Sequence, residues 1–266
     1  MPVLIVIPAR YASTRYPGKP LVGLRGAGGA VKPLIERSWL AAQAVAGVDR
    51  VVVATDDVRI RDAAQAFGAE VVMTAPEAAN GTERCAEAHA ALGGGFDIVV
   101  NLQGDAPLTP PWFVGDLVTG LRGDPDAGIA TPVLRCDGRM LHGLLADRRS
   151  GRVGGTTAVF GTGGRALYFS KEVIPYTGTT YASDQPTPVF HHVGVYAYRS
   201  DALAAYPGWP VGPLEALEGL EQLRFLENRR PVLCVEVAAR GRQFWELNNP
   251  QDVPVIEAMM AEMGLE

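Results

Sequence analysis

The chain opens with residue types that could bind a polyphosphate. An apolar run at residues 3–7 is followed by a polar loop with two guanidinium groups, one ammonium group and two hydroxyls, carried by Arg10, Ser13, Thr14, Arg15 and Lys19. The run is rich in Val and Ile and ends at Pro8, which predicts a central strand of an α/β sheet. Ligands bind just beyond the carboxyl ends of such strands. Although scattered cations often form only a solvated basic loop, their position here favours binding of several phosphate oxygens.

A carboxylate follows a second buried strand. Residues 97–102 form another apolar run, and Asp105 comes shortly after it. Negative charge on a polyphosphate is usually neutralised by a divalent ion that carboxylate oxygens hold. An Asp after Gly is also a common turn residue. Together with the cationic loop, however, the position of Asp105 predicts a metal ligand.

The elements that must position these residues alternate between strand and helix in the first half, which predicts a parallel sheet wrapped by helices. Strands are predicted at residues 3–7, 50–55, 70–73 and 97–102, and helices at 34–40, 60–67 and after Asn80, which with Glu83 resembles a capping box. Beyond Thr131 we expect Gly-rich hairpins with strands at 167–169, 193–198 and 232–237. A helix from Pro213 with leucines along one side and a last helix at 250–263 complete the prediction.

Composition excludes several classes of protein. The 266 residues can bury a sizeable core, and the formal charge of −5 argues against general binding of nucleic acid or anionic membranes. Three cysteines, Cys85, Cys136 and Cys234, form no CxxC pair, which fits a reducing compartment and predicts small core residues. The opening apolar run is too short for a membrane span and has no charged leader. We therefore expect a cytoplasmic protein.

The opening segment IPARYASTRYPGKPL resembles that of the 3-deoxy-manno-octulosonate (KDO) cytidylyltransferases, whose usual form is IPARxxSTRLPGKPL; only Tyr16 departs. The resemblance implies an enzyme of lipopolysaccharide or capsule synthesis that transfers CMP from CTP to KDO or a related 3-deoxy-ulosonic acid with help from Mg²⁺. It also implies a nucleotide-diphospho-sugar-transferase-like three-layer α/β/α fold with a mostly parallel central sheet and a small β-rich dimerisation lobe. Residues 1–266 would form one domain, with a sugar-binding and dimerisation lobe within 131–200, and the enzyme would be a homodimer.

Two further segments resemble nucleotide-binding motifs of this family. QGDAP at residues 103–107 is similar to QGDEP, in which the Asp holds Mg²⁺ and the Gln lies by the ribose, although Ala106 replaces the Glu. NGTER at residues 80–84 is similar to SGTxR, which lies against cytosine and ribose, although alone it would be an ordinary helix cap. The TDD at residues 55–57 resembles ATDD and is expected to shape the pocket.

Segments in the second half resemble the sugar site. ALYFSK at residues 166–171 is similar to ALYFSR, HHVGVY at 191–196 to HLGIY, and PLE with EQLR at 213–224 to the same letters in the family. On an alternating strand, His192 and Tyr196 would project in a regular pattern. A single His on a strand more often has a structural role, and Tyr196 could be a core residue. The prediction that both bind the sugar therefore depends on the motifs occurring in the same order as in the family.

The resemblance assigns roles residue by residue. Catalytic roles fall to Arg10, Lys19 and Asp105, and the metal to Asp105 with Asn248. Substrate-binding roles fall to Ala9, Ser13, Arg15, Asn80, Gly81, Thr82, Arg84, Gln103, Tyr168, His192, Tyr196, Glu221 and Gln222.

Three departures bear on the chemistry. Thr157 stands where the family has a Lys, residues 26–31 are an insertion, and Asn248 stands where a second metal-binding Asp is expected. An amide oxygen can still bind Mg²⁺ but brings no formal charge. The changes at Thr157 and Ala106 leave open CMP activation of another acidic sugar, such as a sialic-acid-like nonulosonate. The loss of one expected cation and one expected carboxylate leaves open a catalytically silent paralogue that binds CTP or a CMP-sugar.

Overall fold

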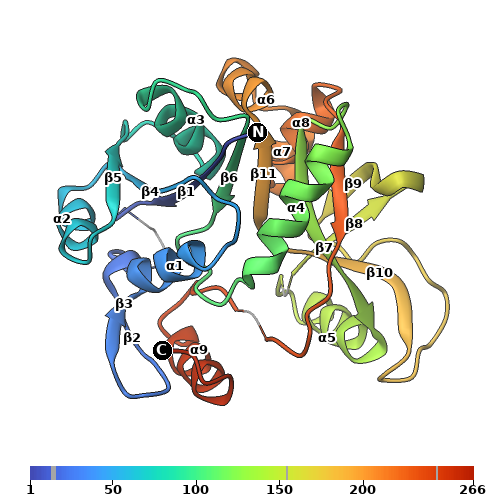
Figure 1. Ribbon diagram of the computed structural model, residues 1–266. Helices are drawn as coiled ribbons and strands as arrows, with labels where there is room; N and C mark the ends of the chain where they lie inside the picture. Colours follow the sequence, from blue (N-terminus) through green and yellow to red (C-terminus); the bar gives the residue numbers. More distant parts are fainter. Residues whose placement is uncertain (13–15, 154, 244) are drawn as a thin grey trace. The chain divides into compact units, whose positions relative to one another are not determined.

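The computed structural model of the protein describes residues 1–12, 16–153, 155–243 and 245–266 (Figure 1). The chain divides into two compact units, one formed by Met1–Gly115 with Ala239–Glu266 and the other by Asp116–Ala238. Helix α4 (Pro111–Gly123) contains the first boundary along the chain. The lobe predicted within residues 131–200 lies inside the second unit.

The first unit contains the predicted parallel sheet. Its strands run in the order β5 (Glu70–Met73), β4 (Arg50–Thr55), β1 (Val3–Ala9) and β6 (Ile98–Leu102). All three pairings are parallel, and Ile5 pairs with Val51 on one side and Val100 on the other. Because residues 3–7 are fully buried, both faces of β1 are covered, as the continuous apolar run predicts.

Helices cover this sheet as its alternating elements require. They are α1 (Leu34–Gln43), α2 (Val58–Ala66) and α3 (Gly81–Ala91), and Figure 1 shows α3 above and α1 below β1 and β4. Asn80 accepts the N–H of Glu83, so the predicted cap of α3 is confirmed, and the Asp57 side chain caps α2 by accepting the N–H of Arg59. Glu83 reaches back to the N–H of Ala79, one residue beyond its partner in a standard capping box.

The insertion at residues 26–31 joins a small hairpin to the end of the chain. Strands β2 (Gly23–Arg25) and β3 (Val31–Pro33) pair antiparallel, and Ala27 N–H donates to the Leu265 carbonyl at 2.8 Å. Behind the hairpin, the last helix α9 (Asp252–Glu262) contributes to an apolar cluster formed by Leu24, Leu34, Leu108, Leu247, Ile256 and Met260. The insertion therefore has a structural partner in the C-terminal segment.

The second unit has a largely antiparallel sheet. Its strands run in the order β11 (Val195–Arg199), β7 (Ile129–Asp137), β10 (Pro186–His192), β8 (Thr156–Phe160) and β9 (Ala166–Ser170), with β12 (Val232–Glu236) parallel to β7. The helices of the second unit after α4 are α5 (Gly138–Arg149), α6 (Ser200–Ala205), α7 (Pro213–Glu218) and α8 (Leu223–Glu227). Short 3₁₀ turns lie at Lys19–Leu21 in the first unit and at Thr162–Gly164 and Tyr206–Gly208 in the second.

Two predictions about the second half are wrong. The single helix expected from Pro213 is two short helices, because Gly219 adopts a left-handed conformation with φ 61° and ends α7. As a result Leu217 is exposed while Leu223 is buried, so the leucines do not share one buried side. The expectation that His192 and Tyr196 lie on one alternating strand is also wrong: His192 is the last residue of β10, and Tyr196 belongs to β11. The strand expected at residues 193–198 is itself present as β11, which begins at Val195.

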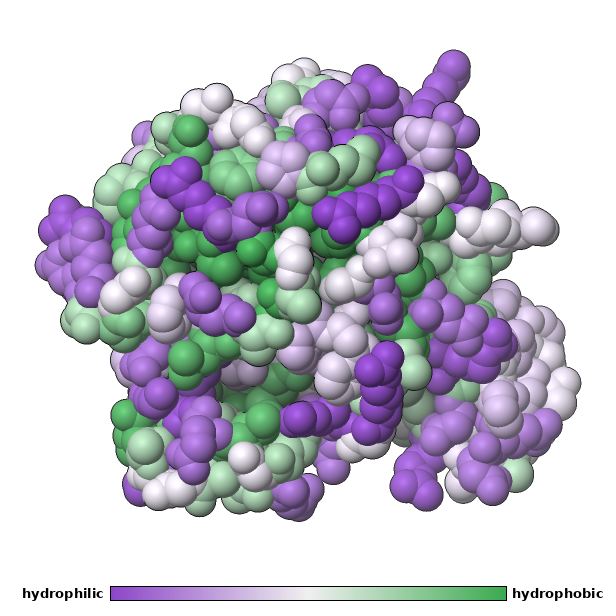
Figure 2. Space-filling model, viewed as in Figure 1, coloured by the Kyte–Doolittle hydropathy of each residue, from purple (hydrophilic) through white to green (hydrophobic). Residues whose placement is uncertain are grey.

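The three cysteines are buried thiols, as predicted. In the parts of the chain that the structure describes, no helix is long and apolar enough to span a bilayer. Figure 2 shows apolar residues interspersed with hydrophilic ones on the surface drawn, and the exposed large apolar side chains include Leu167, Tyr176 and Leu217.

Candidate functional site

The first candidate site lies beyond the carboxyl ends of β1 and β6. Ala9 is buried at the end of β1, and the next residue, Arg10, is exposed to solvent. The loop closes where the Gly18 N–H donates to the Tyr11 carbonyl at 3.0 Å. Gly18 has φ 71°, and a Cβ there would lie 3.1 Å from the Tyr11 ring, so this position requires glycine. Ser13, Thr14 and Arg15 lie outside the described residues.

Lys19 and Asp105 come together directly. The Lys19 Nζ lies 2.6 Å from Asp105 Oδ2, and only 13% of the lysine side chain and 25% of the aspartate side chain are exposed. Gly104 permits this arrangement, since a Cβ there would lie 2.7 Å from the Pro8 carbonyl oxygen. The Ser38 hydroxyl also donates to the Gly104 carbonyl at 3.0 Å. Two residues predicted from separate motifs thus share one polar site.

Asn248 is placed near this pair by the backbone. The Leu247 N–H donates to the Asp105 carbonyl at 2.9 Å. Asn248, which is half-buried, is the next residue after Leu247. A carboxylate and an amide offer the oxygen ligands that suit Mg²⁺, which usually keeps several waters. Among the described residues, no three His, Cys, Asp or Glu side chains converge on a metal site. The donor set therefore fits Mg²⁺ held partly by a substrate phosphate rather than a closed protein cage.

The predicted base-binding segment starts α3 and is partly used for internal contacts. Gly81 approaches the buried Asn101 so closely that a Cβ would lie 3.0 Å from Asn101 Nδ2. Thr82 is buried, and Arg84 is buried with its guanidinium bonded to the Thr74 hydroxyl and 3.5 Å from Asp56 Oδ1. Arg84 therefore has an observed structural role, and the TDD segment supplies its partner. Gln103 is half-buried just after β6.

The second candidate site is in the second unit. The Tyr196 hydroxyl donates to Gln222 Oε1 at 3.1 Å, and the His192 and Tyr196 rings lie 5.7 Å apart. Gln222 is 1% exposed, and its Nε2 has no hydrogen-bond partner among the described residues. An unpaired buried donor is costly, so this amide is suited to an oxygen acceptor on a ligand. The structure thus brings three predicted sugar-site residues together.

Other residues set the orientation of this group. His192 Nε2 lies 2.9 Å from the Thr131 hydroxyl, which donates to the Val195 carbonyl at 2.9 Å. The same hydroxyl also lies 3.3 Å from the Val193 carbonyl oxygen, so it links His192 to the segment between β10 and β11. Burial lowers the pKa of His192 to about 3, with a smaller effect from His191. His192 is therefore a neutral hydrogen-bonding group.

The pKa of His192 predicts a loss of stability in acid. The unfolded chain binds a proton near pH 6.5 and the folded chain does not, so the free energy of unfolding should fall as the pH drops below 6.5. Between pH 6.5 and 5 this one group should cost up to about 2 kcal/mol. Urea unfolding at both pH values should show a smaller loss for His192→Gln. An equal loss in the variant and the parent would contradict the assignment.

Glu218 is a site residue that the sequence reasoning missed. It accepts from the Tyr168 hydroxyl at 3.4 Å, the Ser170 hydroxyl at 2.6 Å and the Lys171 N–H at 2.9 Å. Desolvation, with a further contribution from Glu218, raises the pKa of Tyr168. The signal in the sequence was only its position between the PLE and EQLR motifs.

Glu221 and Thr157 have structural contacts. The Glu221 carbonyl accepts from the Tyr206 hydroxyl at 3.2 Å, and its side chain is half-buried. Thr157, at the position of the expected Lys, is fully buried and bonds the Glu172 carbonyl and the Ile174 N–H. At the position of the family's Lys, this chain therefore has a buried hydroxyl with a structural role.

Comparisons with known proteins show the family of the chain. A family described as "Cytidylyltransferase" matches residues 4–232. The 3-deoxy-manno-octulosonate cytidylyltransferase of Maricaulis maris is 46% identical and covers 99% of both chains, and the 8-amino-3,8-dideoxy-manno-octulosonate cytidylyltransferase of Shewanella loihica is 37% identical over 98% of this chain and 99% of its own. A solved structure of CMP:2-keto-3-deoxy-manno-octonic acid synthetase complexed with CTP is 36% identical, with a TM-score of 0.83 and coverage of 99% of this chain and 100% of the other.

Proposed function

We propose that this chain, which belongs to the family of 3-deoxy-manno-octulosonate cytidylyltransferases, transfers CMP from CTP to the anomeric hydroxyl of KDO or a closely related 3-deoxy-ulosonic acid. The observation that carries the proposal is the contact of Lys19 with Asp105, which joins a phosphate-binding cation and a carboxylate beyond the ends of two parallel strands.

In the proposed reaction, the anomeric hydroxyl oxygen attacks the α-phosphorus and the bond to the bridging oxygen of the β-phosphate breaks. The products are the CMP-sugar and pyrophosphate, and the hydroxyl proton passes to solvent. Arg10, Arg15, Ser13 and Lys19 would bind the triphosphate, while Ala9, Gln103 and residues 80–84 would contact cytosine and ribose. Since none of the site residues that the structure describes is an obvious general base, positioning and electrostatic stabilisation would supply most of the acceleration.

Mg²⁺ would be held by Asp105 and Asn248 and would neutralise charge that develops on the phosphates. Lys19 already gives Asp105 a counter-charge, and Asn248 adds none, so the protein groups alone should bind the ion weakly.

This charge balance predicts the effect of Asn248→Asp. The added carboxylate should lower the Mg²⁺ concentration for half-maximal rate by about tenfold. Titration of the initial rate with Mg²⁺ at saturating CTP measures this change. An unchanged or higher half-saturation concentration would contradict the role of residue 248, and Asn249→Asp provides a neighbouring control.

Tyr168, His192, Tyr196, Glu221 and Gln222 would bind the sugar. Support comes from the unpaired Nε2 of Gln222, which can donate to a sugar hydroxyl or carboxylate, and from the neutral His192, whose ring lies 5.7 Å from that of Tyr196. Tyr196 would hold the amide in place, because its hydroxyl occupies Gln222 Oε1 and leaves Nε2 for the ligand.

Pyrophosphate release tests the substrate. The enzyme would be incubated with CTP and Mg²⁺ together with KDO, its 8-amino-8-deoxy analogue, a nonulosonate or no sugar. We expect release with KDO and none without sugar. Release with the nonulosonate alone would transfer the assignment to that sugar class, and CTP binding without release in any mixture would favour a catalytically silent paralogue.

We further propose that the enzyme is a cytoplasmic homodimer of lipopolysaccharide or capsule synthesis. Three buried cysteine thiols are compatible with a reducing compartment. The edge strand β9 exposes Leu167, and Tyr176 and Leu217 are also exposed apolar side chains of the second unit. Such side chains are suited to burial against a second copy. Light scattering should give twice the chain mass of 28.3 kDa.

A further inference from the structure

One carboxylate holds the segment that carries Asn248. Asp252 Oδ2 accepts the N–H of Asn248 at 2.9 Å and that of Asn249 at 2.7 Å, while its Oδ1 accepts the Trp245 Nε1–H at 3.1 Å. Asp252 is the first residue of α9, so the carboxylate is attached to a regular helix. Three donors from the preceding segment therefore converge on one side chain.

A second anchor lies on the other side of Asn248. The Leu247 N–H donates to the Asp105 carbonyl at 2.9 Å, and the Leu247 side chain is fully buried with Leu108 and Ile256. Ile256 belongs to the same helix as Asp252. Asn248 is thus fixed between a bond to the backbone of Asp105 and a bond to a carboxylate at the start of α9.

We propose that Asp252 is a positioning residue that fixes Asn248 relative to Asp105 and thereby sets the affinity of the CTP-bound enzyme for divalent cations. The proposal rests on the proposed function, in which Asn248 is a ligand. A neutral amide attracts a cation only through its oxygen dipole, which must be correctly placed. Groups that orient metal ligands typically change affinity by about 10- to 100-fold when they are removed.

The test is a double-mutant cycle with Mn²⁺ as the probe. Electron paramagnetic resonance would measure free Mn²⁺ with the full chain and saturating CTP, without sugar, in the parent, Asp252→Ala, Asn248→Ala and the double variant. Each single substitution should weaken Mn²⁺ binding by about tenfold or more. The double variant should bind Mn²⁺ as Asn248→Ala does, because Asp252 acts through Asn248. CTP affinity without metal should stay unchanged.

Asp137→Ala is a matched control, because Asp137 also accepts a backbone N–H at the start of a helix, that of Met140 at 2.8 Å. It should leave Mn²⁺ binding unchanged. If Asp252→Ala does not fold, Asp252→Asn keeps the size and one carbonyl acceptor, and it should weaken Mn²⁺ binding to a smaller extent. Thermal unfolding of every variant shows that the measured protein is folded.

The outcomes separate this inference from the proposed function. Unchanged Mn²⁺ binding in both Asp252 variants, with weaker binding in Asn248→Ala, would overturn the positioning role alone. Additive losses in the double variant would also overturn it, because Asp252 would then act independently of Asn248. Unchanged binding in Asn248→Ala would instead remove Asn248 from the metal site of the proposed function, and the positioning role with it.

Discussion

Asp105→Asn should lower the rate of pyrophosphate release by on the order of 10³-fold at saturating CTP and sugar. The substitution keeps the side-chain shape but removes the charge that would hold Mg²⁺ at the phosphates, a contribution of several kcal/mol to the transition state. It also leaves Lys19 without the carboxylate that lies 2.6 Å away. Steady-state rates, with circular dichroism to show an intact fold, measure the effect.

The control for this prediction is Asp62→Asn. Asp62 is exposed and forms a surface ion pair with Arg61, and it lies outside both candidate sites. Its replacement should leave the rate unchanged. An Asp105→Asn enzyme that retains a tenth or more of the parent rate would show that Asp105 is only a turn residue.

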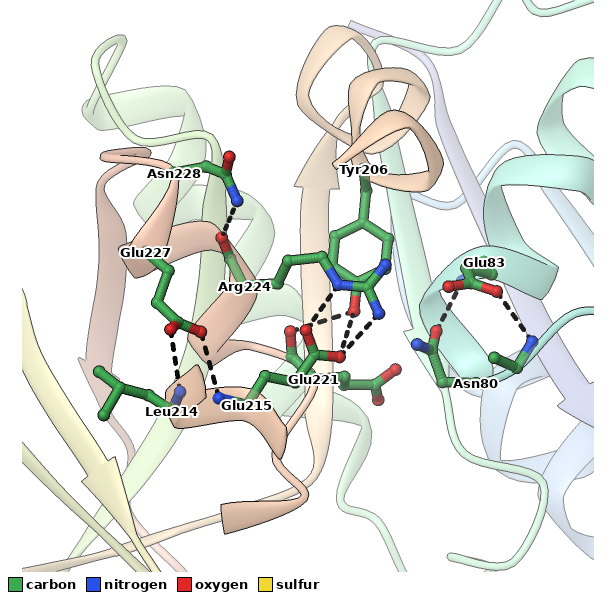
Figure 3. A network of polar contacts seen from close by, with 10 residues as sticks. Asn80, Glu83, Tyr206, Leu214, Glu215, Glu221, Arg224, Glu227 and Asn228 are labelled. Carbon is green, nitrogen blue, oxygen red and sulfur yellow. Dashed lines mark hydrogen bonds and ion pairs between the residues drawn. The ribbon is translucent and has the colours of Figure 1, made fainter. Parts of the chain in front are cut away.

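Arg224→Met should reduce the free energy of unfolding by about 3–5 kcal/mol, because it leaves the Glu215 carboxylate buried without its charged partner. Figure 3 shows this bidentate ion pair, in which Arg224 Nε and Nη2 lie 2.6 and 2.7 Å from the two Glu215 carboxylate oxygens. Only 3% and 9% of the two side chains are exposed. The Arg224 guanidinium also lies 4.2 Å from the centre of the Tyr206 ring. Equilibrium unfolding in urea measures the loss.

An exposed ion pair provides the comparison. Arg50 and Glu70 form a similar contact, but about two-fifths of each side chain is exposed, at 39% and 44%. Arg50→Met should cost less than about 1 kcal/mol, because solvent screens the charges. Equal losses in the two variants would mean that burial does not determine the strength of the Glu215–Arg224 pair.

The first unit was largely predictable because its signals are local. The apolar run at residues 3–7 is buried on both faces of β1, and the carboxylate and amide at positions 57 and 80 cap their helices. The contact between Lys19 and Asp105 follows from two parallel strands that end at one edge of the sheet. The sequence alone could not show that the Arg84 guanidinium contacts Thr74 and Asp56, because these contacts depend on side chains from three separate segments.

The second unit was less predictable because its elements are short and its contacts are distant in sequence. A leucine spacing suggested one helix from Pro213, but the left-handed Gly219 interrupts it. HHVGVY looked like one strand, yet its first two residues end β10 and its last two begin β11. Glu218 and Asp252 were missed because their importance comes from backbone and side-chain donors that only the folded chain assembles.

Phosphorus NMR of the products tests the central claim most directly. With CTP, Mg²⁺ and KDO, we expect that the α-phosphorus of CTP becomes a phosphodiester, that inorganic pyrophosphate forms in equal amount, and that mass spectrometry finds CMP joined to KDO. CMP or CDP formed by hydrolysis, with KDO unchanged, would contradict the assignment of this chain as a KDO-activating cytidylyltransferase.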